Sequence, residues 1–92
     1  MLPITIKARV TGRVQGVAYR HWTRARAQSL GLKGWVRNDV SGAVIAQIEG
    51  EKRLVNQMVD EMWSGPGAAS VRDVQSRTVT TSASSKKFEI IR

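Results

Sequence analysis

One segment, GRVQGVAYR from Gly12 to Arg20, has the composition of a site that binds an anion. A turn that contains two glycines lets consecutive backbone N–H groups point toward one position, and a helix that starts behind it adds the positive end of its dipole. The guanidinium of Arg20 can donate to two phosphate oxygens at once. The segment therefore predicts a phosphate-binding loop. We expect its main-chain donors to be the N–H groups of Gln15, Gly16, Val17, Ala18, Tyr19 and Arg20.

A second block follows at Gly34-Trp35-Val36-Arg37-Asn38, with Gly42, Val44 and Gly50 behind it. The carboxamide of Asn38 is the side chain of this block that can orient a neutral reactant such as water. An asparagine just after a strand is more commonly a turn residue, so its chemical assignment depends on the first block. We interpret the glycines of the second block as turn residues without a chemical role.

Strands and helices must position these two blocks. The alternation of apolar and polar residues from Ile4 to Val10 predicts a strand, and apolar residues at helical spacing between Glu51 and Trp63 predict a helix. The full series is a strand at 4–10, a helix at 20–30, strands at 34–38 and 43–49, a helix at 51–63, a strand at 70–80 and a short strand at 88–91, with a polar loop at 80–85. This order predicts an α+β, ferredoxin-like βαββαβ sandwich with an antiparallel sheet, both helices on one face and a short extra C-terminal strand.

Taken together, the two blocks closely resemble the signatures of the acylphosphatases, which hydrolyse the carboxyl–phosphate bond of acyl phosphates. The resemblance implies that Arg20 binds the phosphate and that Asn38 orients the attacking water. It also implies an acyl phosphate as substrate and inorganic phosphate as product. Tyr19 stands where the family usually has phenylalanine, which leaves one hydroxyl without an assigned partner.

The chemistry of such a substrate needs neither a metal nor a cofactor. A carboxylate leaves as a stable anion, so no metal pair and no cysteine or histidine nucleophile is required, and the chain contains no cysteine. The first block also lacks the Gly-Lys-Ser/Thr ending of a nucleotide-binding P-loop. The single histidine, His21, is interpreted as a surface or capping residue.

Length and composition predict one small domain spanning 1–92. The N-terminal residues alternate in polarity and include Lys7 and Arg9, unlike a signal peptide, and no apolar run is long enough to span a bilayer. We therefore expect a cytoplasmic protein with no membrane partner, and we expect a monomer.

The net charge of +8 is concentrated in the first part of the chain. All eight charged residues before Asp39 are basic, and the rest of the chain carries seven basic and seven acidic residues. This charge could steer a dianionic substrate to the loop. It could equally serve solubility or attract polyanions without specificity, and the sequence leaves both open.

The rival hypothesis is a non-catalytic ferredoxin-like module that binds RNA or another anion. Such modules stack bases on aromatic side chains of the central strands. The outward positions expected here are Thr5, Lys7 and Arg9 on one strand and Ile45, Gln47 and Glu49 on the other, and the three tryptophans are expected in or beside the core. No specific nucleic acid partner is therefore expected. A third hypothesis is a degenerate domain that binds a phosphorylated group within a larger complex.

Overall fold

The computed structural model describes residues 3–80 and 86–92. Within them the elements are β1 (Ile4–Arg13), α1 (Tyr19–Ser29), β2 (Lys33–Asn38), β3 (Val44–Gly50), α2 (Lys52–Met62), β4 (Ser70–Val79) and β5 (Phe88–Ile90). The predicted order and the predicted ferredoxin-like class are confirmed, and β1 runs past Val10 to Arg13. The polar loop predicted at 80–85 lies, apart from Thr80, outside the described residues.

The sheet is mixed, with strand order β4-β1-β3-β2-β5. β1 pairs antiparallel with both β3 and β4, and β2 pairs antiparallel with β3, as predicted. β5 corrects the prediction of a wholly antiparallel sheet, because it pairs parallel with β2. Since β4 and β2 run in opposite directions, a chain that reverses after β4 and reaches the edge of β2 must run parallel to it.

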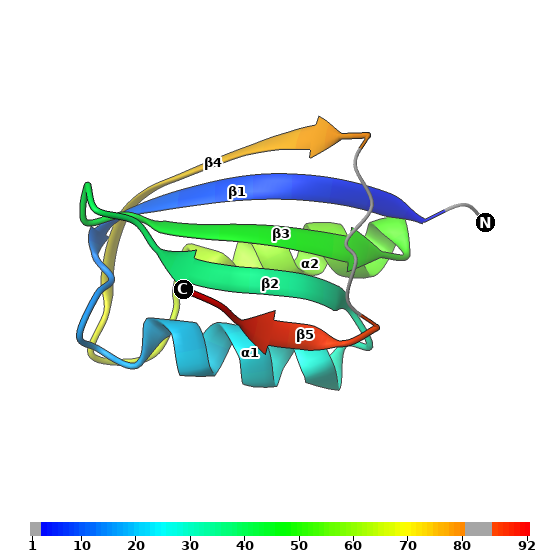
Figure 1. Ribbon diagram of the computed structural model, residues 1–92. Coiled ribbons are helices and arrows are strands. Elements are labelled where there is room, and N and C mark those ends of the chain that lie inside the picture. The colour runs from blue at the N-terminus through cyan, green and yellow to red at the C-terminus, as the bar shows by residue number, and fades with distance from the viewer. Residues whose placement is uncertain (1–2, 81–85) are drawn as a thin grey trace.

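Both helices pack on one face of the sheet (Figure 1). The inward residues predicted for β1 form part of the core with apolar residues of β2 and β3, and α2 contributes Val55, Met58 and Met62, all fully buried. Trp22 packs against this core. The expectation that all three tryptophans lie in or beside the core is wrong for Trp63, which is 48% exposed, and for Trp35, which alternates with core residue Val36 and lies on the opposite face.

The β1–α1 connection and the β2–β3 turn lie at the same end of the sandwich (Figure 1). The first connection lies within the predicted phosphate-binding segment, and the second begins directly after Asn38. Strand pairing of β1 and β2 on either side of β3 thus brings the two sequence blocks to one edge of the molecule. Across residues 3–80 and 86–92, neither helix combines the length and the hydropathy needed to cross a membrane.

Candidate active site

The loop at 14–18 connects β1 to α1 and owes its shape to two residues with positive φ. Gly16 has a φ of 74° and Ala18 a φ of 63°. Glycine adopts this conformation without strain, whereas alanine does so at a cost of about 1–2 kcal/mol. Val14 is buried at the start of the loop and anchors it, while Gly16 and Ala18 are exposed. The loop therefore holds a specific bend at the surface.

Consecutive main-chain donors in and after this loop lack acceptors. In the part of the chain that the structure describes, the N–H groups from Gln15 to His21 donate to no protein atom, and the first paired one is Trp22 N–H, 3.0 Å from the carbonyl oxygen of Ala18. No side chain caps the helix, and its first turn contains no acidic residue. Such a run of donors at a helix N-terminus is suited to bind an anion.

Arg20 lies in the first turn of α1, directly behind the loop. Its side chain is partly buried, and it makes no hydrogen bond or ion pair with residues 3–80 or 86–92. By contrast, Arg26 in the same helix forms a bidentate pair with Glu61 of α2, at 2.5 and 2.9 Å. The guanidinium of Arg20 is thus available to a ligand. His21 beside it is exposed, as predicted.

Asn38 is the last residue of β2 and lies opposite Val44 of β3. Its side-chain oxygen Oδ1 is buried and accepts no hydrogen bond, the one such buried side-chain atom among the described residues. Leaving a buried acceptor unpaired costs about 1–3 kcal/mol. An unpaired buried carboxamide oxygen is therefore a position at which a bound water or ligand would complete the hydrogen bonding.

Gln15 joins the loop to the β2–β3 turn. Its Nε2 donates to the carbonyl oxygens of Asp39, at 2.8 Å, and Ala43, at 2.9 Å. The same Ala43 oxygen accepts from Asp39 N–H at 2.8 Å, which closes the turn. The structure thereby links the anion-binding loop to the residue that follows Asn38. The sequence predicted a role only for the main-chain N–H of Gln15. The side-chain contacts could not be predicted, because their acceptors are main-chain carbonyl oxygens, which residues of every type have.

The turn itself is held by the Asp39 carboxylate. It accepts from the Ser41 hydroxyl at 2.6 Å and the Ser41 N–H at 3.1 Å, and Arg37 lies 3.3 Å away. These hydrogen bonds, the one from the Ser41 hydroxyl foremost, lower the pKa of Asp39 below its ordinary value of 3.8. The carboxylate therefore stays charged at neutral pH and fixes the turn next to Asn38.

The structure shows the hydrogen-bond partner of the Tyr19 hydroxyl, which the sequence left unassigned. The hydroxyl donates to the carbonyl oxygen of Met62 at 2.7 Å, at the C-terminal end of α2, and the ring is 1% exposed. Burial raises the pKa of Tyr19 above its ordinary range. The buried hydroxyl thus ties the start of α1 to the end of α2.

Fold and site together define a small ferredoxin-like domain with an anion-binding loop. Comparison with known proteins shows to which family within this class the chain is similar. The family model described as "Acylphosphatase" matches residues 6–90. A curated acylphosphatase from Rhizobium meliloti (strain 1021) is 49% identical over 84 residues, which cover 91% of this chain and 88% of that protein.

Solved structures agree with the sequence comparison. An acylphosphatase from Coxiella burnetii superposes with a TM-score of 0.91 at 31% identity, covering 97% of this chain and 93% of the other. The crystal structure of acylphosphatase from Bacillus subtilis gives a TM-score of 0.92 at 27% identity, covering 97% and 99%. The chain belongs to the acylphosphatase family. It is accordingly a hydrolase of the type that cleaves the carboxyl–phosphate bond of small acyl phosphates.

Proposed function

We propose that acyl phosphate hydrolysis takes place at the loop 15–20, with Arg20 and Asn38 as the catalytic side chains. The N–H groups of this loop and the Arg20 guanidinium would hold the phosphoryl oxygens, and Asn38 Oδ1 would accept a hydrogen bond from the attacking water. One observation carries the proposal: the run of N–H groups without acceptors lies at the same end of the fold as a buried carboxamide oxygen without a donor, and Gln15 links the two.

The proposed roles follow from the reaction. The water oxygen attacks phosphorus as the bond to the acyl oxygen breaks, and the bonding electrons leave with the carboxylate. Because the transition state of phosphoryl transfer is loose, catalysis depends on positioning and on stabilising charge at the phosphoryl oxygens. Each charge-assisted hydrogen bond contributes about 1.5–3 kcal/mol. A neutral amide is too weak a base to ionise water, so we assign the water proton to a phosphate oxygen.

We also propose that the reaction needs no metal and no cofactor. The positive charge at the phosphoryl group would come from Arg20 and from the N-terminus of α1, and a carboxylate needs no Lewis acid to leave. Turnover should therefore be unchanged after EDTA treatment. Loss of activity with EDTA, restored by a divalent cation, would overturn this part of the proposal.

Three further expectations belong to the proposal. We propose that residues 1–92 act as a single domain, as a monomer and in the cytoplasm. The proposed catalytic groups all come from one chain and one edge of one sandwich, which supports a monomeric enzyme. Light scattering coupled to size-exclusion chromatography measures the oligomeric state directly, and a mass of twice 10.2 kDa would contradict a monomer.

Hydrolysis of benzoyl phosphate in EDTA tests the site. Arg20→Ala should lose nearly all turnover, whereas Arg24→Ala, a substitution of the same kind one turn further along α1, should keep it. Inorganic phosphate should inhibit the wild type and bind poorly to Arg20→Ala. Equal activity in wild type and Arg20→Ala would rule out this assignment of the site. A folded wild type without activity would contradict the enzymatic function and favour the anion-binding or RNA-binding hypothesis.

A further inference from the structure

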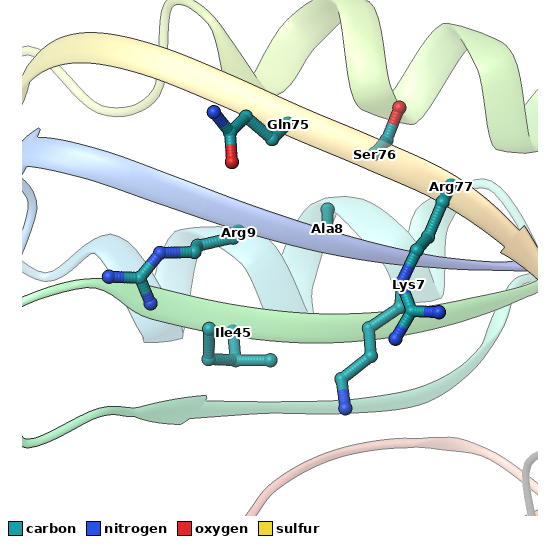
Figure 2. A pocket seen from close by; sticks show the side chains of 7 residues that line it. All are labelled: Lys7, Ala8, Arg9, Ile45, Gln75, Ser76 and Arg77. Carbon is teal, nitrogen blue, oxygen red and sulfur yellow. The ribbon is translucent and has the colours of Figure 1, made fainter.

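A second basic site lies on the sheet face opposite the helices. Register places Lys7 and Arg9 of β1, Ile45 of β3 and Arg77 of β4 on this face. Figure 2 shows Lys7 and Arg77 on one side and Arg9 extending away from them on the other, and these residues line a hollow of about 260 Å³. Ile45 is buried and gives the hollow an apolar floor, while the three cations lie around it. Neither Arg20 nor Asn38 lines this hollow.

Lys7 and Arg77 are directly opposite each other in the β1–β4 register. Like charges in this position destabilise a sheet. Neither side chain has a hydrogen bond or an ion pair within residues 3–80 and 86–92. Arg9 differs, because it donates to the Ser41 hydroxyl at 3.1 Å and lies 3.9 Å from Asp39. Glu49 of β3 shares this face, where it accepts a hydrogen bond from Thr5 at 3.0 Å. Within the described residues Lys7 and Arg77 form no ion pair with it, so an anionic ligand would neutralise both cations.

An aromatic side chain lies on the same face. Trp35 of β2 is opposite Gln47 of β3, which is in turn opposite Lys7 of β1. The two intervening strand spacings separate the Trp35 and Lys7 positions by about 10 Å. The Arg37 guanidinium lies 5.9 Å from the centroid of the Trp35 ring. This face thus combines cations, an apolar floor and a tryptophan, although the outward positions of β1 and β3 contain no aromatic residue.

We propose that this face, defined by Lys7, Arg9, Trp35, Ile45 and Arg77, binds single-stranded nucleic acid without sequence preference. The cations would contact phosphates, and bases would lie on Ile45 and stack on Trp35, the combination found in single-strand binding surfaces. An acidic peptide would match the cations but has no flat rings for Trp35. In a duplex the bases are stacked on one another and cannot lie on the sheet. The site is separate from the acylphosphatase site and goes beyond its function.

Fluorescence anisotropy of a labelled oligouridylate of about ten nucleotides tests the proposal, since single-strand sites of this kind span about 4–16 nucleotides. The double variant Lys7→Gln/Arg77→Gln should weaken binding at least about tenfold and make the slope of log K against log salt less steep by about 1.4, the value for two lost phosphate contacts. The matched control Arg24→Gln/Arg53→Gln removes the same charge from α1 and α2, on the other side of the sheet, and should weaken binding less than about threefold.

Trp35→Leu measures the contribution of base stacking to binding separately from the contribution of charge. It leaves the net charge unchanged and should weaken oligouridylate binding roughly tenfold, because base–aromatic stacking contributes at this scale. Thermal unfolding of each variant checks that it is folded. Wild-type binding by a folded Trp35→Leu variant would overturn the stacking of bases on this face.

Two further measurements distinguish this site from the acylphosphatase site. Arg20→Ala should bind the oligonucleotide like the wild type, and Lys7→Gln/Arg77→Gln should hydrolyse benzoyl phosphate at the wild-type rate. The proposal is overturned if the wild type does not bind oligouridylate, or if both double variants lose affinity equally, which would show only an effect of total charge. Tighter binding of polyglutamate or of a duplex than of the single strand would overturn it as well.

Discussion

The Gln15 side-chain amide lies 2.8 Å from the carbonyl oxygen of Asp39 and donates a hydrogen bond to it. This contact joins the loop after β1 to the turn after β2, two segments separated by 24 positions in the chain. Gln15 lies at the start of the row of N–H groups without acceptors, and Asp39 directly follows Asn38. Any movement of one segment relative to the other therefore changes the distance between the proposed phosphate position and the proposed water position.

Gln15→Met tests this link. Methionine has a similar length but donates no hydrogen bond, so the carbonyl oxygens of Asp39 and Ala43 lose the Gln15 donor. We expect a loss of about 1–2 kcal/mol in the free energy of unfolding. We expect kcat/KM for benzoyl phosphate to fall about tenfold or more, because small displacements of catalytic groups carry large costs in rate. Gln75→Met, an exposed substitution of the same kind on β4, should leave both quantities unchanged.

Asn38→Ala tests the positioning of water. We expect kcat to fall about 10²–10³-fold, the effect of removing one positioned polar group, while inorganic phosphate still binds at the loop. Inhibition by phosphate measured beside kcat separates the two roles. Asn56→Ala, an exposed position on α2, serves as the control. Full activity in Asn38→Ala would be incompatible with the proposed role.

Tyr19→Phe removes the hydroxyl that donates to the Met62 carbonyl oxygen. This leaves a buried acceptor unpaired, so we expect the free energy of unfolding to fall by about 1–2 kcal/mol. Activity should be retained, because phenylalanine keeps the buried ring, fits the family pattern and leaves the main-chain N–H in place. Urea denaturation followed by Trp fluorescence measures the first quantity. A large loss of kcat with unchanged stability would instead assign the hydroxyl to the reaction.

The fold could be predicted from the sequence because its signals are local. Alternation from Ile4 to Val10 and helical spacing from Leu54 to Met62 each need only a short window. The parallel pairing of β5 with β2 could not be predicted this way, since it joins positions more than fifty residues apart, such as Gly34 and Phe88, and depends on which edge of the sheet remains open.

The prediction for Trp35 failed for a related reason. Alternation along β2 places Trp35 and Arg37 on one face and Gly34 and Val36 on the other, but it does not say which face the helices cover. The core under β2 is filled in part by Phe88 of β5, so the small residues face inward and the tryptophan faces outward. In the site, the main-chain donors could be inferred from the glycines and the helix start. The Gln15 and Tyr19 side-chain contacts could not, because their acceptors are main-chain oxygens.

Acid should weaken the β2–β3 turn through Asp39. Hydrogen bonds from Ser41 lower the folded-state pKa below the ordinary value of 3.8, so the carboxylate stabilises the fold above that value and the contribution is lost as pH falls through the lower folded pKa. Asp39→Asn keeps an acceptor for Ser41 but does not titrate. Urea midpoints between neutral pH and pH values below the ordinary pKa should therefore fall more in the wild type than in Asp39→Asn. Parallel pH dependence in both proteins would contradict the assignment.

The facing cations Lys7 and Arg77 should reduce the stability of the ligand-free protein. We expect Lys7→Gln or Arg77→Gln to raise the free energy of unfolding by about 0.2–1 kcal/mol at low salt, because either change removes the repulsion between opposite positions. The second substitution added to the first should have little further effect, so a double-mutant cycle should give a coupling of that size. The coupling should vanish near 1 M salt, where the Debye length is about 3 Å. If each substitution instead destabilises the protein, the aliphatic stems of these side chains contribute more by packing than their charges cost by repulsion.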